Sequence, residues 1–172
     1  MKDKLVRTFF SIPVPEGVRS VKKLFYKSMK DSRGEIRWVR DYQLHITLSF
    51  LGHTPSDSID PIIKAVKGIF SNQKPLELTI EKTGCFPAST RPRVLWLGVS
   101  GDTEKLDLMV KEINGLLTPM GYFFEDSSFI PHITIARIRY PQKHTPDINE
   151  FLKSSYDGIV FHADRVQFVC SE

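Results

Sequence analysis

The chain has 172 residues and a formal net charge of +4, with 41% hydrophobic and 26% charged residues, values typical of a globular protein. It contains no apolar run of about 18 residues and no signal-peptide pattern at its N-terminus, so neither a transmembrane helix nor a secretory leader is expected. Cys85 and Cys170 provide no disulfide framework and no Cys-x-x-Cys motif. A cytoplasmic location is therefore expected, and the mild positive charge permits an anionic substrate without requiring one.

The hydrophobic pattern changes period along the chain, as expected for a protein that mixes helices and strands. In the first half the expected elements are, in chain order, a strand over 5–12, a helix from Pro15 to Met29, strands over 36–39 and 44–51, and a helix over 59–70 capped by Ser56 or Ser58. In the second half they are strands over 76–80 and 94–99, a helix from Asp102 to Leu117, strands over 130–138 and 159–169, and a short helix over 147–153. Residues 82–93 are expected to form a loop.

This order of elements predicts an α+β fold made of two similar halves. The halves are expected to meet within residues 83–93. Because no linker or low-complexity segment separates them, residues 1–172 are expected to form a single domain of two closely packed lobes.

One short pattern occurs once in each half. Residues 44–48 read Leu-His-Ile-Thr-Leu, and residues 131–135 read Pro-His-Ile-Thr-Ile. Side chains alternate between the two faces of a strand, so the histidine and threonine of each motif share one face, about 6.6 Å apart, and the apolar residues take the other. If a pseudo-twofold axis relates the halves, both His-x-Thr pairs line one central cleft.

Two imidazoles and two hydroxyls on one cleft suit the hydrolysis of a phosphodiester. One group must remove a proton from the attacking water and another must give a proton to the departing oxygen, and imidazole can do either near neutral pH. His45 and His132 are therefore the candidate acid and base, in an order that the residues leave open. Thr47 and Thr134 are the candidate phosphate-binding hydroxyls, and the scheme requires no metal and no cofactor.

Other interpretations compete with this one. A zinc site usually needs three protein ligands, and only Asp41 precedes the first motif, with nothing equivalent before the second. A non-catalytic nucleotide-binding module of the same fold would use the same cleft, although binding alone does not need a matched acid and base. A structural role remains the default for the other histidines, His53, His144 and His162.

Four segments carry a resemblance to a known family, namely 7–13, 37–52, 93–99 and 129–137, and they span nearly the whole chain. They read Arg-Thr-Phe-Phe-Ser-Ile-Pro, Arg-Trp-Val-Arg followed by Leu-His-Ile-Thr-Leu-Ser-Phe-Leu-Gly, Arg-Val-Leu-Trp-Leu-Gly-Val, and Phe-Ile-Pro-His-Ile-Thr-Ile-Ala-Arg. The chain thereby resembles the two-histidine (2H) phosphoesterase superfamily. Within it, the likeness is to the LigT-like RNA 2′,3′-cyclic phosphodiesterases, which were first described as 2′-5′ RNA ligases.

The resemblance implies a bilobal fold in which two antiparallel sheets with outer helices surround a central cleft. It implies metal-independent hydrolysis of RNA 2′,3′-cyclic phosphate ends to 2′-phosphomonoesters, with reversible 2′-5′ ligation as a secondary reaction. By position, His45 would protonate the leaving 3′ oxygen, His132 would activate water, and Thr47 and Thr134 would hold the phosphate. RNA ends or cyclic nucleotides are the expected substrates of a monomer that has no membrane partner.

Further substrate contacts are expected at Arg137 and Phe9. The family places a nucleotide contact at Arg137, yet strand alternation puts this residue on the face opposite Thr134 unless a bulge or the strand's end redirects it. Phe9 is one of several candidates for stacking on a base. The other aromatic candidates are Trp38, Phe50, Phe86 and Phe124. The basic residues expected either to line an entrance to the cleft or to form a solvated surface are Lys82, Arg91, Arg93, Arg139 and Lys143.

The C-terminal end differs from the family pattern. Family members commonly continue past the position of Ser171 into a final strand containing Gly and Tyr, whereas this sequence ends at Glu172. The resemblance therefore implies a difference at one sheet edge more than at the cleft.

Overall fold

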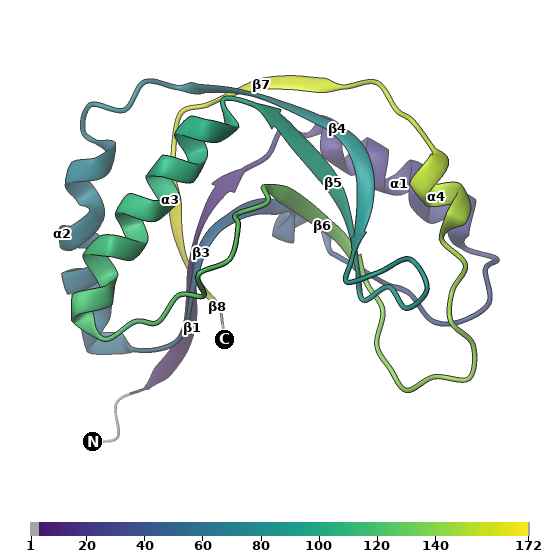
Figure 1. The fold of residues 1–172 in the computed structure, drawn as a ribbon, viewed down its shortest axis with the longest axis horizontal. Coiled ribbons are helices and arrows are strands. Elements are labelled where there is room, and N and C mark those ends of the chain that lie inside the picture. Colours follow the sequence, from purple (N-terminus) through teal and green to yellow (C-terminus); the bar gives the residue numbers. More distant parts are fainter. Residues whose placement is uncertain (1–3, 172) are drawn as a thin grey trace.

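A computed structural model, which describes residues 4–171, shows one curled antiparallel sheet flanked by four helices (Figure 1). The first residues of the N-terminal segment considered above, Met1 to Asp3, and the terminal Glu172 lie outside the described residues. The strands are β1 (Leu5–Pro13), β2 (Arg37–Trp38), β3 (His45–Pro55), β4 (Leu76–Phe86), β5 (Val94–Gly101), β6 (His132–Arg137), β7 (Ile159–Ala163) and β8 (Gln167–Ser171). The helices are α1 (Gly17–Met29), α2 (Ile59–Phe70), α3 (Thr103–Leu117) and α4 (Asn149–Lys153), and the short 3-10 turns are η1 (Asp41–Gln43), η2 (Ser56–Ser58) and η3 (Thr118–Met120). The predicted α+β class is confirmed.

The strand order is β7-β4-β5-β6-β3-β1-β8, and β2 also pairs with β6. The two halves of the chain meet at the centre of this sheet, where β3 and β6 pair through Ile46 and Ile133. The expectation of two separate sheets is therefore wrong, because this central pair joins the strands of both halves into one. A pseudo-twofold relation between the halves stays a prediction.

The segment expected to be one strand over 159–169 is two strands on opposite edges of the sheet. β7 pairs with β4 and β8 pairs with β1, and exposed Asp164 and Arg165 lie between them. In Figure 1, β7 crosses the top of the arch and β8 runs down beside β1. A single apolar run therefore supplies both edge strands, because the curl of the sheet brings its two edges within reach of one short connection.

Part of the expected loop over 82–93 is strand. β4 continues to Phe86, and Lys82 is an extra residue in it, because Glu81 pairs with Gly98 while Thr83 pairs with Leu97. Lys82 has a positive φ of 66°, and such a bulge breaks the alternation of side chains on which the sequence prediction depended. Smaller differences are that α1 begins at Gly17 rather than Pro15, and that Ser58 precedes α2 without a side-chain capping bond.

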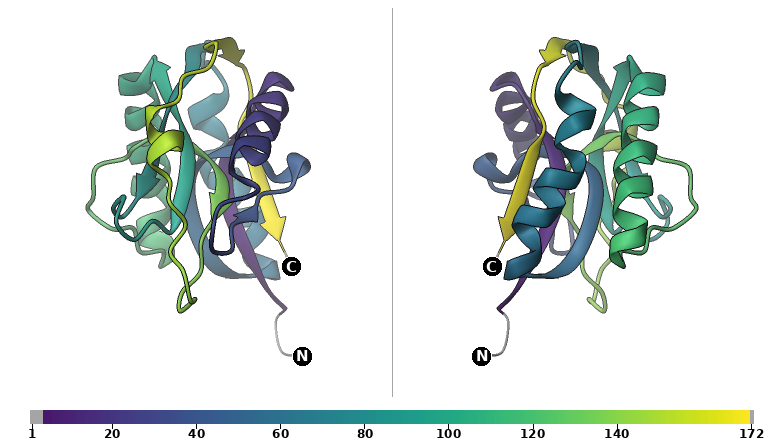
Figure 2. Two further views of the ribbon diagram at one scale, coloured as in Figure 1. Left: turned by 90° about the vertical axis from the view of Figure 1, so that its right-hand side faces the viewer. Right: turned by 90° about the vertical axis from the view of Figure 1, so that its left-hand side faces the viewer.

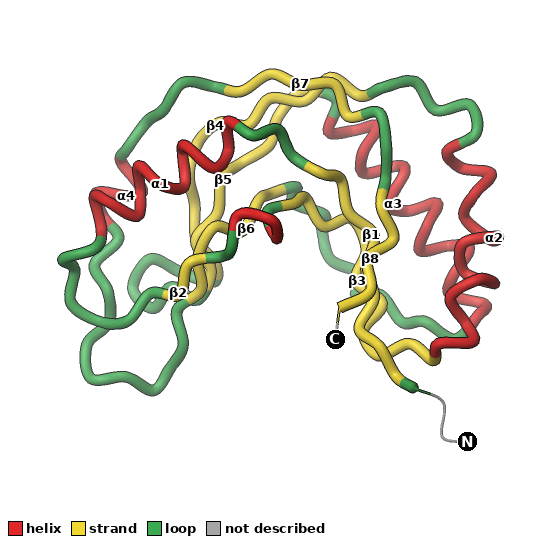
Figure 3. The backbone as a smooth tube through the Cα atoms, turned by 180° about the vertical axis from the view of Figure 1, so that it is seen from behind, coloured by secondary structure: helices red, strands yellow, loops and turns green. Residues whose placement is uncertain are grey.

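Apolar side chains from the helices cover one face of the sheet. The buried helical residues are Val18, Phe25 and Met29 in α1, Ile62 and Val66 in α2, Leu106, Met109, Val110, Ile113 and Leu117 in α3, and Phe151 in α4. Helices α2 and α3 lie together at one end of the arch and α1 and α4 at the other (Figures 1 and 3). Phe25 of α1 and Phe151 of α4 meet edge to face. The side views show the strands between these helices (Figure 2). This packing leaves the central strands with one face directed away from the helices.

Candidate active site

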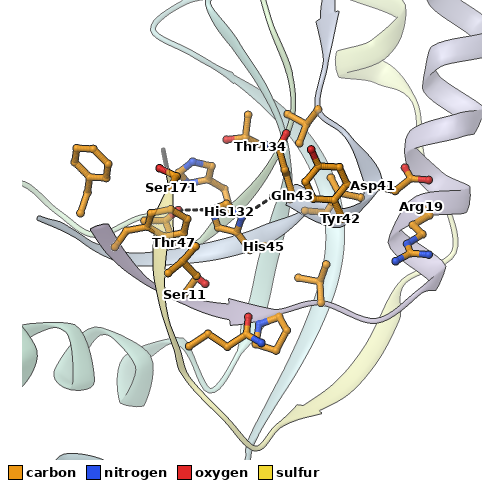
Figure 4. Close-up of a pocket in the computed structure, with 18 of the residues that line it drawn as sticks. Ser11, Arg19, Asp41, Tyr42, Gln43, His45, Thr47, His132, Thr134 and Ser171 are labelled. Atoms are coloured by element: carbon orange, nitrogen blue, oxygen red, sulfur yellow. Dashed lines mark hydrogen bonds between the residues drawn. The ribbon is translucent and has the colours of Figure 1, made fainter. Parts of the chain in front are cut away.

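The four motif residues meet at the centre of the sheet. Because Ile46 lies opposite Ile133 in an antiparallel pair, His45 is level with Thr134 and Thr47 with His132. The four side chains thus occupy the corners of a patch, and ideal strand spacing puts the two histidine Cα atoms about 8 Å apart on its diagonal. All four residues line one cleft of about 870 Å³ (Figure 4).

Within the two motifs, the face opposite the histidines and threonines is apolar. Ile46, Leu48, Ile133 and Ile135 are buried, and each belongs to the hydrophobic core. Burial of such side chains contributes roughly 1.5–3 kcal/mol each to stability, so the core fixes which way both strands face. The alternation predicted for the motifs is confirmed.

Both histidines have the same orientation relative to the backbone. The Nδ1 atom of His45 donates to the carbonyl of Gln43 at 2.6 Å, and Nδ1 of His132 donates to the carbonyl of Ile130 at 2.7 Å. A carbonyl oxygen only accepts hydrogen bonds, so the proton of each neutral ring lies on Nδ1. The Nε2 atom of each ring is therefore the atom that can exchange a proton with a substrate.

The two imidazoles have different neighbours. His45 has its Nε2 3.0 Å from the Thr47 hydroxyl, and the ring of Phe9 stacks on it at 4.9 Å between centroids. The His132 ring instead meets the Phe86 ring edge-on, with 5.1 Å between centroids, and its centroid lies 6.1 Å from that of the Trp96 ring. Aromatic contacts of this kind restrict ring motion, so both imidazoles are held in place from the side as well as by the Nδ1 bond.

Burial lowers the pKa of both His45 and His132, since it disfavours the charged imidazolium. The hydrogen bonds that the rings donate to the carbonyls of Gln43 and Ile130 raise the pKa, and the positive charge of Arg137 lowers the pKa of both rings further. Both histidines are therefore neutral at pH 7 in the free protein. An anion bound between them would raise both pKa values and favour protonation of one ring.

Arg137 lies on the cleft because β6 contains a bulge. Thr134 pairs with Trp96 and Ala136 pairs with Leu95, so Ile135 is an extra residue. Ile135 and Ala136 are both buried, and the next residue, Arg137, lines the cleft. The redirection that strand alternation required is confirmed.

The same irregularity follows the first motif. Thr47 pairs with Ser11 and Ser49 pairs with Phe10, which leaves Leu48 as the extra residue. Leu48 and Ser49 are both buried, and Phe50 then lines the cleft at the position that Arg137 occupies in the second motif. Arg7 lies over the Phe50 ring at 5.4 Å from its centroid and is a further cation of this cleft besides Arg137.

Some of the remaining predicted contact residues line the cleft and others do not. Phe9 and Phe50 line the cleft, whereas Trp38 packs edge-on against Tyr26, and Phe124 packs against the hydrophobic core. None of the five basic residues predicted as possible entrance residues lines the cleft, namely Lys82, Arg91, Arg93, Arg139 and Lys143. Of these, Arg91 and Arg93 stack on the Tyr140 ring at 4.4 and 5.5 Å.

Several lining residues escaped the sequence analysis. Gln43 acts through its backbone carbonyl, which no side-chain pattern reveals. Tyr42 could have been found from its place in a polar turn directly before the first motif. Ser11 is 1% exposed, and its Oγ is among the buried side-chain polar atoms of residues 4–171 that lack a hydrogen-bond partner.

Within residues 4–171, no group of three or more His, Cys, Asp and Glu side chains is arranged to hold a metal ion. In the same part of the chain, none of the helices has the length and apolar character needed to cross a lipid bilayer.

The comparisons with known proteins agree with each other. The sequence pattern of the LigT like Phosphoesterase family matches residues 12–96. A protein from Aquifex aeolicus named RNA 2′,3′-cyclic phosphodiesterase is 32% identical over 95% of this chain and 85% of its own length. A protein of the same name from Thermotoga maritima is 34% identical over 78% of this chain and 71% of its own length. A crystal structure of E. coli LigT complexed with 3′-AMP has a similar fold, with a TM-score of 0.65, 22% identity, and 98% and 96% of the two chains covered.

Proposed function

We propose a function from one premise: the chain belongs to the LigT-like phosphoesterase family. The proposed reaction is the hydrolysis of 2′,3′-cyclic phosphate ends of RNA to 2′-phosphomonoesters. Relatives from two organisms that carry the name RNA 2′,3′-cyclic phosphodiesterase support the reaction class. The bound 3′-AMP in E. coli LigT supports a nucleotide as ligand of this fold.

One observation carries the proposed chemistry, namely that His45 and His132 commit Nδ1 to backbone carbonyls and line one cleft. In the proposed step, Nε2 of His132 takes a proton from water, and the water oxygen attacks phosphorus. The bond from phosphorus to the 3′ oxygen breaks, and the protonated Nε2 of His45 gives its proton to that oxygen. One water is consumed, the phosphate stays on the 2′ oxygen, and proton exchange with solvent restores both rings.

The residues around the pair have supporting roles in this proposal. Thr47 and Thr134 donate hydroxyl hydrogen bonds to the non-bridging phosphate oxygens, and Arg137 balances their charge. The Thr47 hydroxyl lies 3.0 Å from Nε2 of His45. Protonation of Nε2 removes its acceptor lone pair, so the threonine proton can turn to the phosphate while the Nε2 proton is directed at the 3′ oxygen. Ligation to a 2′-5′ linkage would need an RNA 5′-hydroxyl in place of water as the attacking group, with the same P–O3′ bond breaking, and it is not needed to account for any residue of the cleft.

The proposed function predicts a 2′-nucleotide product in the presence of a chelator. Incubation with 2′,3′-cyclic mononucleotides in excess EDTA is expected to proceed at the rate seen without EDTA, because imidazoles supply both proton transfers. Chromatography against 2′- and 3′-nucleotide standards identifies the isomer, and His45→Ala protein purified in the same way controls for contaminating nucleases. A 3′-nucleotide product, or loss of activity that added metal restores, would contradict the proposal.

The proposed chemistry also predicts an acid-shifted pH profile. Activity needs one neutral and one protonated imidazole, and the pKa of both is lowered in the free protein. The optimum of kcat/KM is therefore expected below about pH 6.5, the ordinary pKa of histidine, with activity lost above it as the acid loses its proton. The optimum of kcat is expected at higher pH, because bound phosphate raises both pKa values.

Replacing Arg137 tests whether its charge lowers the pKa of the two histidines. Its charge lowers the pKa of both histidines, so Arg137→Gln is expected to move the kcat/KM profile to higher pH, whatever it does to the rate. Profiles measured in buffers of constant ionic strength between pH 5 and 9 would show the shift. A flat profile in the unsubstituted protein, with chemistry established as rate-limiting, would contradict paired acid–base catalysis.

A further inference from the structure

The cleft extends beyond the histidines toward helix α1, and the proposed reaction uses none of the residues there. Val14, Arg19, Val39, Asp41 and Tyr42 line this arm of the cleft. In Figure 4, Tyr42 lies beside Gln43, on the side of the histidines that faces Asp41 and Arg19. Its side chain is unusual because Tyr42 is 71% exposed although it is a large aromatic residue.

The turn that carries Tyr42 is fixed to the body of the protein. Lys22 of α1, whose side chain is 13% exposed, forms an ion pair with Asp41 at 2.6 Å and donates to the carbonyl of Val39. Arg40 donates to the Tyr42 hydroxyl at 3.1 Å. The ring is thus exposed but held, and a ligand that stacks on it has little side-chain motion to freeze.

The charged residues that line this arm are paired. Asp41 is paired with Lys22, and Glu16 is paired with Arg19 at 3.5 Å, while Val14 and Val39 are apolar. Arg40, which donates to the Tyr42 hydroxyl, is not among the lining residues. An arm of paired charges and apolar groups offers little attraction to a phosphate. It suits a neutral, planar group with polar edges, which is the character of a nucleobase.

The position of Tyr42 also fits a base. It lies three residues before His45, which limits the separation of their Cα atoms to about 10 Å. In a 2′,3′-cyclic nucleotide the base and the phosphate are attached to the same ribose. A group that contacts the base must therefore lie about one sugar ring away from the histidines, and Tyr42 satisfies this condition.

We propose that Tyr42 is a stacking platform for the base of the terminal nucleotide, and that the arm toward α1 is the nucleobase subsite. This inference rests on the proposed function, because it assigns the base of the same substrate. Tyr42 does not touch the reacting atoms, so it determines affinity rather than the rate of the chemical step. Because the ring stacks on a face that every base shares, the subsite accepts purines and pyrimidines and favours the larger purines.

Steady-state kinetics with two substrates tests the assignment. One substrate is adenosine 2′,3′-cyclic phosphate, and the other is glycerol 1,2-cyclic phosphate, which has the reacting ring without a base. In Tyr42→Ala, the ratio of kcat/KM for the nucleotide to that for the glycerol compound is expected to fall about tenfold through KM, since base stacking is worth roughly 5- to 150-fold. Tyr42→Phe keeps the ring but loses the hydrogen bond from Arg40, so it is expected to restore most of the ratio. Phe123→Ala changes an exposed aromatic residue (87%) outside the cleft and should leave the ratio within twofold.

Binding gives a readout that is independent of turnover. In a His132→Ala background, 2-aminopurine riboside 2′,3′-cyclic phosphate is expected to lose fluorescence on binding, and addition of Tyr42→Ala should weaken binding about tenfold and reduce the quenching. An unchanged substrate ratio and unchanged quenching in Tyr42→Ala would overturn the subsite while leaving the proposed function intact. If the unsubstituted protein hydrolysed neither of the two cyclic phosphates, the proposed function itself would be overturned.

Discussion

Replacing either His45 or His132 with alanine is expected to lower kcat for 2′,3′-cyclic nucleotide hydrolysis by about 10²- to 10⁴-fold, the usual contribution of a positioned acid or base. Each substitution removes one of the two proton transfers on which the proposed step depends. The fold should tolerate both substitutions, because the two rings line the cleft. The motif residues that pack in the core are the neighbouring Ile46 and Ile133. Initial rates with a saturating cyclic nucleotide measure the effect.

Three controls make this result specific. Thermal unfolding should show that each variant remains folded, and His162→Ala, at an exposed histidine of β7 outside the cleft, should keep full activity. The double variant should be little worse than either single variant, because both groups act in one step. Activity close to that of the unsubstituted protein in both single variants would exclude the paired mechanism.

The assignment of acid and base can be tested separately. A cyclic substrate with sulfur in place of the 3′ oxygen has a leaving group that needs little protonation. If His45 is the acid, this substrate should recover much of the activity lost in His45→Ala, and it should not do so in His132→Ala. The reverse pattern would exchange the two roles while leaving the pair in place.

The motifs were predictable because their geometry is local. Alternation along a strand is enough to put His45 with Thr47 and His132 with Thr134, and the apolar residues between them identify the buried face. What joins the two pairs is the register of β3 against β6 at Ile46 and Ile133, a contact between residues 87 positions apart. Sequence could indicate that the pairs meet only by assuming a symmetry between the halves.

The positions of the bulges could not be predicted from the sequence. Strand alternation showed that Arg137 needs redirection, but the place of the extra residue is set by the pairing of β6 with β5 at Leu95 and Trp96. The partner strand β5 in turn holds Trp96 against Gly84 of β4, where a Cβ atom would collide with the indole. Irregularities that depend on three strands at once leave no signature in the sequence of any one of them.

Backbone groups account for other features that the sequence could not predict. The carbonyls of Gln43 and Ile130 orient the two imidazoles, and any residue could supply them. Phe9 as a substrate contact stays a prediction, and the structure gives its ring a second role by stacking it on His45. A local pattern therefore predicts the candidate reacting side chains, and the folded chain shows the groups that hold them.

The threonines should show the next largest effect. Thr47→Val and Thr134→Val are each expected to lower kcat/KM for cyclic nucleotides by about 10²-fold, the lower end of the effect of removing one donor to a developing anion. Valine keeps the shape and strand preference of threonine, so the change isolates the hydroxyl group. Inhibition by inorganic phosphate should weaken in both variants, which separates phosphate binding from contacts to the base.

The two variants should also differ from one another. The Thr47 hydroxyl is 3.0 Å from Nε2 of His45, so its removal should alter the pH dependence of kcat/KM as well as its size. Within the described residues no hydrogen bond joins Thr134 to His132, and Thr134→Val should therefore lower the rate without moving the profile. Thr47→Ser and Thr134→Ser keep a hydroxyl group and should retain most of the activity. If both valine variants stayed within threefold of the unsubstituted protein, the hydroxyls would have no part in binding the phosphate, and the acid–base pair would have to act with Arg137 alone.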